Sequence, residues 1–455
     1  MKHHVLPPGP EGLPIVGNIF QFRRDQLAFV RGVQRSFGDV ATISLGKLPI
    51  VLFSRPEHVR YFLVDNARNF TNREFAWNLR RLLGDGLLTI DGDFRRQQRR
   101  LVQPAFHKKR VESYAAVMVQ HTREMLDEWQ SGAEVDIARE MQTLTLRIVA
   151  KSLFDVDLKT ESRGLGQAFS DVIENPLDMP FSLRALPINL PFTPYGKHMA
   201  GRATLDAYVY EVIARRRKDG RDTGDVLSML LSAHDDGVTM TDVQVRDQTM
   251  TLFAAGHETT ANALSWTFYL LSEHPHVRVK LQAELARVLA GRDPTVDDLP
   301  NLPYLEWVMN ESLRMYPPAW TQGRRAREAF DLAGYTFPAG TTVMFSQWVL
   351  HHLPDIWGDP ETFRPERWDP ERGQKVPQGA YFPFGAGPRM CIGAPFAQLE
   401  ARLLLATILQ RYEPRLVPGF SVVTGPRVTL RPKHGIRMTL EPVRTKTAAS
   451  LPVRA

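Results

Sequence analysis

The stretch FGAGPRMCIG, Phe384–Gly393, holds the only cysteine among the 455 residues of the chain. The amphipathic sequence that follows it, residues 394–412, predicts a helix. Cys391 therefore stands at or just before a helix N-terminus, where backbone N–H groups and the helix dipole favour a thiolate over a thiol. The plainer alternative is a small buried apolar side chain, which is the usual role of a lone free cysteine.

The composition bounds the class of protein. The chain is 43% hydrophobic and 24% charged, which is enough apolar sequence for a large core and excludes a disordered chain. A single cysteine excludes an internal disulfide and a four-cysteine metal site, and it fits a reducing compartment. No signal peptide pattern is visible, and no apolar run reaches the roughly 18 residues that span a bilayer. We therefore expect a soluble, cytoplasmic protein without a transmembrane anchor.

The formal net charge is +7, and it is unevenly placed. Residues 95–110, RRQQRRLVQPAFHKKR, carry seven Lys and Arg side chains and no acid. A basic segment of this kind is typical of contact with nucleic acid, a membrane surface or an acidic protein, and it is equally typical of a solvated helix face.

The pattern along the chain predicts one large, mainly helical domain with a minor β part, spanning residues 1–455. Alternation around Gly46-Lys47 predicts a hairpin, and residues 334–350 predict a second strand pair. A helix over 30 residues long is expected between Thr241 and Pro275, begun by a capping box of Thr241 and Gln244. Residues 1–20 form a proline-rich lead-in, and residues 443–455 are expected to be a disordered tail.

Several short stretches match the sequence patterns of other enzyme classes only in part. GAGPRM begins like a dinucleotide-binding loop, but Met390 stands where the third glycine is needed. HETTA begins like a zinc-protease helix, but Ala261 stands where the second histidine is needed. GxxxxGK[ST] and GxSxG are both absent from the sequence. The hydrolase and NTPase classes therefore lose their usual support.

The middle of the long predicted helix carries AAGHETT, residues 254–260. Gly256 in a helix interior costs about 1 kcal/mol relative to alanine, and polar Glu258 and Thr259 sit among apolar flanks. Stability given up in this way is typical of a functional site. The alternative is a helix contact at the glycine, with the acid facing the surface.

Four motifs occur in one order: AGHETT, ESLR, FRPERW and FGAGPRMCIG. In this combination the chain resembles the cytochrome P450 family of haem-thiolate monooxygenases, from its proline-rich start to about Leu430. The resemblance implies the family's triangular, mostly helical prism with a small β-rich lobe around a buried haem b.

The resemblance also implies site residues. Cys391 is the expected axial ligand of the haem iron, with Phe384 packed beside it and Gly256 and Gly393 against the cofactor. The expected partners of the haem propionates are Arg389, Arg324, Arg95 and Arg99. Glu258 and Thr259 match the acid and alcohol that deliver protons during oxygen activation, while Glu311, Arg314 and Arg367 match a buried structural triad. The expected substrate pocket comprises Phe75, Trp77, Leu87, Phe253, Ala254, Ala255, Ala319 and Trp320.

The implied reaction inserts one atom of O2 into a C–H bond of a lipophilic molecule such as a fatty acid, terpenoid or polyketide, by hydroxylation or epoxidation. Electrons must come from a separate ferredoxin or flavodoxin with its reductase, because the chain has no motif for a flavin or iron–sulfur domain. We expect a monomer that does not bind nucleic acid. The alternatives are a peroxygenase or rearranging member of the same fold, and a haem-binding sensor without turnover.

Overall fold

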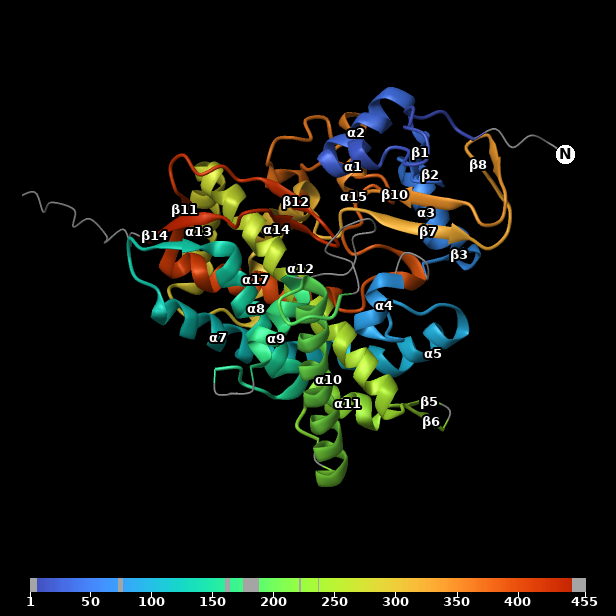
Figure 1. Ribbon diagram of the computed structural model, residues 1–455. Coiled ribbons are helices and arrows are strands. Elements are labelled where there is room, and N and C mark those ends of the chain that lie inside the picture. The colour runs from blue at the N-terminus through green and yellow to red at the C-terminus, as the bar shows by residue number, and fades with distance from the viewer. Residues whose placement is uncertain are drawn as a thin grey trace, which may run out of the picture.

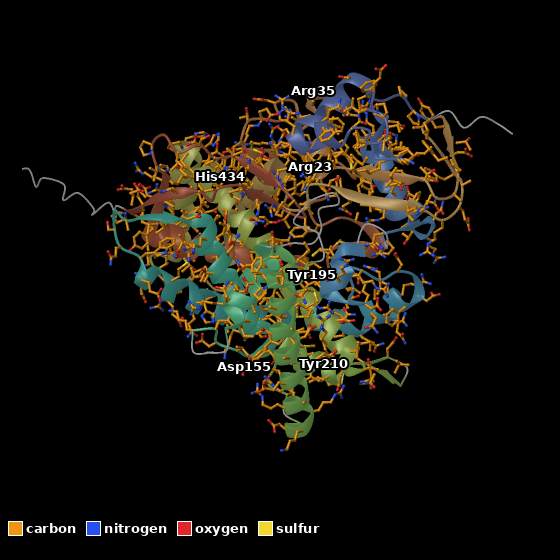
Figure 2. The ribbon with its side chains drawn as sticks, in the orientation of Figure 1. Arg23, Arg35, Asp155, Tyr195, Tyr210 and His434 are labelled. Carbon is orange, nitrogen blue, oxygen red and sulfur yellow. The ribbon has the colours of Figure 1, made fainter. Side chains whose placement is uncertain are left out.

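The computed structural model describes residues 6–72, 77–159, 164–174, 188–220, 222–235 and 237–443. Figure 1 shows a large helical part and, at the upper right, a smaller lobe in which strands gather with the N-terminal helices. Figure 2 shows Arg23 and Arg35 on this lobe, while Asp155 and Tyr210 lie at the lower end of the helical part. The predicted mainly α architecture with a minor β lobe is confirmed. Residues 444–455 of the predicted tail lie outside the described residues.

Helices make up most of the described chain. Their bounds are α1 (Ile19–Arg24), α2 (Gln26–Phe37), α3 (Pro56–Arg60), α4 (Trp77–Leu83), α5 (Gly92–Val102), α6 (Lys108–Ser113), α7 (Ala115–Glu128), α8 (Ile137–Phe154), α9 (Leu165–Glu174), α10 (Pro194–Asp219), α11 (Val226–Ser232), α12 (Asp242–Glu273), α13 (Pro275–Leu289), α14 (Pro303–Met315), α15 (Gln347–Leu350), α16 (Pro354–Trp357) and α17 (Ala394–Arg411).

Helix α12 is the predicted long helix, and it runs through the middle of the molecule (Figure 1). Both hydrogen bonds of the predicted capping box are present: Gln244 N–H donates to the Thr241 hydroxyl, and the Thr241 N–H donates to the Gln244 side chain. The helix packs against α8, α10, α14 and α17. Neighbours on several sides explain why its sequence is apolar on most faces.

The β lobe is built on a five-stranded sheet in the order β1-β2-β10-β7-β3. Its strands are β1 (Val40–Leu45), β2 (Leu48–Phe53), β10 (Thr342–Phe345), β7 (Gln322–Ala326) and β3 (Phe70–Thr71). Strands β1 and β2 pair antiparallel across Gly46-Lys47, which confirms the predicted hairpin. Strand β10 pairs parallel with β2 and antiparallel with β7, so it ties the N-terminal hairpin to the segment that follows α14.

The second predicted strand pair is wrong in its partners. Residues 334–350 hold two strands, β9 (Tyr335–Phe337) and β10, but they do not pair with each other. Strand β9 pairs with β8 (Phe330–Leu332), and β10 joins the main sheet. The apolar strand β10 is fully buried, and its place between β2 and β7 depends on contacts with residues nearly 300 positions earlier.

Smaller sheets complete the fold. A three-stranded antiparallel sheet has the order β11 (Tyr412–Leu416), β14 (Arg437–Pro442), β4 (Glu134–Asp136). Two hairpins are β12 (Thr424–Pro426) with β13 (Leu430–Pro432), and β5 (His234–Asp235) with β6 (Val238–Thr239). Within the described ranges, no helix combines the length and the apolar character needed to cross a bilayer.

Candidate active site

A cavity of about 620 Å³ lies between α12, the loop before α17 and the turn between β12 and β13. Cys391 lies in one wall, and Glu258 and Thr259 of α12 contribute to the lining. Apolar side chains supply much of the rest, among them Leu82, Leu87, Ala254, Ala263, Leu313, Ala319 and Val428. The cavity therefore joins the cysteine loop and the polar pair of α12, which are more than 130 residues apart in the sequence.

The cysteine loop is held by close backbone contacts. Gly387 has φ +63°, and a Cβ at this position would lie 1.8 Å from the carbonyl oxygen of Leu63, so only glycine fits. The N–H of Cys391 donates a 2.9 Å hydrogen bond to the carbonyl oxygen of Phe384, which closes the loop. Phe384 and Gly393 both line the cavity. The loop thus presents the Cys391 side chain to the cavity, three residues before α17 begins.

Two arginines of α5, which also line the cavity, donate hydrogen bonds to this loop. Arg95 donates to the carbonyl oxygen of Pro388 and Arg99 to that of Met390, each at 2.9 Å. Burial, together with the charges of Arg99 and Arg324, lowers the pKa of Arg95 to about 10. Its Nε has no hydrogen-bond partner among the described residues. Arg95 therefore brings a buried and incompletely satisfied positive charge to the cavity wall.

Arg324 of β7 is a second buried cation in the lining. Burial lowers its pKa to about 10. Its guanidinium donates to the carbonyl oxygen of Gly323 and to the side chain of Gln322, and within the described part of the chain it has no carboxylate partner. A buried cation is stabilised by an anion, so Arg95 and Arg324 together point to an anionic group in the cavity.

Arg389 differs from these two. It lines the cavity, but its guanidinium is ion-paired with Asp91 and donates a 2.7 Å hydrogen bond to the carbonyl oxygen of Ile90. The structure therefore gives Arg389 a carboxylate partner within the chain, whereas a cofactor carboxylate was expected. Asp91 precedes α5, so this ion pair fixes the start of the helix that carries Arg95.

The backbone N–H groups at the helix start lower the pKa of the Cys391 thiol, in the expected direction, but they are not the largest influence on it. Surrounding protein raises the pKa of the Cys391 thiol above its ordinary value. The backbone N–H groups of Gly393 and Ala394 and the charge of Arg99 oppose this rise, but they do not outweigh it. The Cys391 side chain itself is exposed to the cavity, and the desolvation comes from elements packed around the loop, which the local sequence does not reveal.

The polar pair of α12 faces the cavity. The Thr259 hydroxyl donates a 2.8 Å hydrogen bond to the carbonyl oxygen of Ala255, one turn earlier. The Glu258 carboxylate accepts a 2.6 Å hydrogen bond from the hydroxyl of Thr429, in the turn after β12. Gly256 also lines the cavity, but a Cβ there would lie 3.3 Å from Val149 of α8. The helix-contact role left open for this glycine is therefore present in the structure.

The predicted pocket residues fall into three groups. Leu87, Ala254, Ala255 and Ala319 line the cavity. Phe253 and Trp320 lie elsewhere: the Phe253 ring packs on Phe154 and His257, and the Trp320 indole donates to the carbonyl oxygen of Arg427. Both were predicted as lining because of their sequence position, yet each points into a packed core. Phe75 and the side chain of Trp77 lie outside the described residues.

The three residues of the expected triad contact one another. Arg314 donates to both carboxylate oxygens of Glu311 at 2.9 Å, and Arg367 donates to one of them at 3.0 Å. All three side chains are buried. Two buried guanidinium groups on one carboxylate form a closed network that fixes α14 against the FRPERW segment.

The comparisons with known proteins agree with this geometry. The sequence profile of the family described as "Cytochrome P450" matches residues 7–437. The chain belongs to the cytochrome P450 family. It is thus a P450 monooxygenase, which uses O2 and a redox partner to oxidise a small molecule.

The relatives of this P450 include bacterial enzymes. Cyclooctatin synthase of Streptomyces melanosporofaciens is 37% identical, with 96% of each chain covered. Pentalenene oxygenase of Streptomyces avermitilis is 34% identical, with 97% of this chain and 98% of the relative covered. A solved structure of a retinoic-acid-bound cyanobacterial P450 superposes with a TM-score of 0.88 at 29% identity, covering 97% of this chain and all of that one.

The residues of the cavity fit the haem-thiolate cofactor of the family. Cys391 presents the one thiol of the chain to the cavity. Arg95 and Arg324 bring buried cations without carboxylate partners in the described chain, which suits the two propionates of a haem. Gly387 lets the cysteine loop pack closely against the backbone at Leu63.

Sequence reasoning missed two features near the cavity. Glu400 of α17 is fully buried, with the Thr260 hydroxyl beside its carboxyl group. The turn Arg427–Thr429 reaches the cavity from a hairpin that no motif indicated. Its placement depends on the long-range hydrogen bond from Leu430 N–H to the carbonyl oxygen of Pro318, which local sequence patterns do not reveal.

Proposed function

We propose that this P450 oxidises a cyclic terpenoid, by hydroxylation or epoxidation, with haem b held by Cys391 and anchored by Arg95 and Arg324. The observation that carries the proposal is the cavity, which joins Cys391, the pair Glu258 and Thr259, and a largely apolar lining. An apolar lining favours a substrate without multiple charges, because burying an unpaired ion is costly.

The names of the relatives support the terpenoid class. Cyclooctat-9-en-7-ol 5-monooxygenase of Streptomyces melanosporofaciens is 38% identical over 90% of this chain. Its name, and the name pentalenene oxygenase, describe oxidation of cyclic carbon skeletons. The volume of about 620 Å³ includes the space that the haem would take beside Cys391, and the apolar side chains elsewhere in the lining, such as Leu82, Leu87 and Val428, suit a terpenoid.

The polar pair of α12 supplies protons in this proposal. When bound, the haem supplies the iron at which O2 is activated. The Thr259 hydroxyl donates its hydrogen bond to the carbonyl oxygen of Ala255. Its oxygen can still accept a hydrogen bond from a water in the cavity. The Glu258 carboxylate, one residue earlier, can pass protons to that water. The apolar side chains around the pair exclude bulk water from the reaction.

Electrons enter from a separate ferredoxin or flavodoxin with its reductase. The enzyme acts as a monomer in the cytoplasm. A reducing compartment suits a chain whose single cysteine forms no internal disulfide.

The test uses the haem-loaded protein and a panel of cyclic sesquiterpenes and diterpenes, with fatty acids and charged metabolites as controls. A spin-state change in the absorbance spectrum reports binding. Turnover under labelled O2, with a surrogate ferredoxin and its reductase, should then place one labelled oxygen atom in a terpenoid product. Product formed only with added hydrogen peroxide, or binding without product, would refute the proposed reaction.

A further inference from the structure

The acid of the proposed proton path is held by a residue far away in the sequence. Thr429 Oγ1 donates to Glu258 Oε1 at 2.6 Å, and Asn262 Nδ2 donates to the same hydroxyl oxygen at 3.1 Å. A hydroxyl has one proton. The Nδ2 atom of Asn262 can donate a hydrogen bond but cannot accept one. The proton of the Thr429 hydroxyl must therefore point to Glu258. The chain of hydrogen bonds therefore has a fixed direction, from Asn262 through Thr429 to the carboxylate.

Helix geometry explains why one hydroxyl reaches both partners. Glu258 and Asn262 are four residues apart on α12, so their side chains lie on the same face of the helix. Thr429 lies between them. Asn262 and Thr429 are only 1% and 6% exposed. Water therefore cannot easily replace a lost hydrogen-bond partner, and losing one is costly. The buried part of the chain of hydrogen bonds is thus confined to one arrangement.

The turn that carries Thr429 is fixed without any help from Glu258. The indole N–H of Trp320 donates to the carbonyl oxygen of Arg427 at 2.9 Å, and that of Trp266 donates to the carbonyl oxygen of Leu430 at 3.0 Å. The N–H of Leu430 donates to a carbonyl in the segment after α14. The backbone is therefore anchored on both sides of Thr429. This fixes the position of the hydroxyl that donates to the half-buried Glu258 carboxylate.

We propose that Thr429 is a positioning residue, which holds the Glu258 carboxylate at the cavity wall in the orientation that proton delivery requires. This inference rests on the proposed role of Glu258. Thr429 acts through the carboxylate and touches neither substrate nor cofactor in this role. Without the hydroxyl, the carboxylate would lose the one side-chain donor that it has among the described residues and rotate away from the path.

The first test needs no substrate. NADH-driven consumption of O2 by the haem-loaded enzyme, with a surrogate ferredoxin and reductase, ends in hydrogen peroxide or in water. Peroxide takes two electrons and two protons per O2, and water takes four of each, so one or two NADH are used per O2. Thr429→Val keeps the branched shape and removes the hydroxyl. We expect it to move the stoichiometry towards one NADH per O2 and to raise peroxide, while Thr429→Ser restores the parent ratio.

Thr267→Val is the matched control. Thr267 is another buried threonine, absent from the cavity lining, whose hydroxyl bonds to Ser312 and to the carbonyl oxygen of Ala263. It should lower stability and leave the stoichiometry unchanged. A similar shift in the control and in Thr429→Val would mean that lost stability causes the effect, which overturns the proposal.

The second test is a double-mutant cycle in denaturant unfolding, with Thr429→Val and Glu258→Ala. If the hydroxyl acts through the carboxylate, Thr429→Val lowers the folding equilibrium constant severalfold more in the parent than in the Glu258→Ala background, where only the hydrogen bond from Asn262 is lost. Equal losses in both backgrounds would overturn the proposal.

The two tests separate the two claims. If Glu258→Ala leaves the NADH-to-O2 ratio unchanged, the proposed role of the acid fails, whatever Thr429 does. If Glu258→Ala shifts the ratio and Thr429→Val does not, the role of the acid stands and the positioning role of Thr429 is wrong.

Discussion

The guanidinium of Arg95 donates a 2.9 Å hydrogen bond to the carbonyl oxygen of Pro388, three residues before Cys391. One side chain of α5 thus supports the cysteine loop, which lies 293 positions further along the chain. The same guanidinium keeps an unpartnered Nε within the described structure and lies in the cavity wall. Arg95 therefore links the geometry of the thiol to the charge that would meet a propionate.

Arg95→Ala should weaken haem retention, because it removes a buried cation and a support of the cysteine loop. We expect haem transfer to apomyoglobin to become about tenfold faster, in line with the loss of a charge-assisted hydrogen bond. Arg96→Ala on the same helix is the control, since Arg96 is exposed and ion-paired with Asp93. Equal haem loss from both variants would remove Arg95 from the cofactor site.

Thr259→Ala should misdirect protons and leave haem binding almost intact. The variant should keep consuming NADH, while terpenoid product falls by about a hundredfold and hydrogen peroxide accumulates. Thr259→Ser should regain most of the product, because it keeps the hydroxyl. Product and NADH consumption are measured in the same reaction. A variant as well coupled as the parent would show that the proton path lies elsewhere.

Glu400 should make stability depend on pH. Burial raises the pKa of this carboxyl to about 8, and the Thr260 hydroxyl opposes the rise. The folded protein then binds a proton that the unfolded chain releases near its ordinary pKa, so stability falls as pH rises from about 4.5 to about 8. The loss is on the order of a few kcal/mol. Glu400→Gln stays neutral, so urea unfolding should show it to be more stable than the parent at pH 8 and similar at pH 4.5. Parallel pH profiles would contradict this charge state.

An acidic electron donor should be steered by exposed lysine near the cysteine loop. Arg100 of the basic segment 95–110 is ion-paired with Asp235, whereas Lys109 of the same segment is exposed on α6. That helix follows Phe106, which lies 3.9 Å from the position of a Cβ on Gly393. Lys109→Glu should slow reduction by ferredoxin several-fold at low salt and less at high salt, because the Debye length shrinks to about 8 Å. Lys47→Glu, at the hairpin turn of the β lobe, is the control with equal charge change. Equal slowing by both variants would exclude local steering.

Local patterns predicted the parts of this fold that local chemistry determines. The capping box at Thr241, the hairpin turn at Gly46-Lys47 and the helix after Cys391 each follow from short-range hydrogen bonds or periodicity. The pairing of β10 and the core positions of Phe253 and Trp320 do not, because each depends on which distant element packs nearby.

The site shows the same division. Motifs identified Cys391 and the pair Glu258 and Thr259 as residues of one site, and the structure places them around one cavity. The partner of Arg389 and the hydroxyl of Thr429 escaped prediction. Both interactions join segments more than 150 residues apart, and no spacing rule connects such segments.

The most direct measurement of the central claim is the absorbance spectrum of the reduced carbon monoxide complex. It is recorded for the parent, Cys391→Ser and Cys391→His, and the bound haem of each protein is quantified. The histidine variant provides the comparison if the serine variant loses its haem. The account predicts the red-shifted band of thiolate ligation in the parent and its loss in both variants. The same red-shifted band in either haem-loaded variant would contradict the assignment of Cys391 as the ligand.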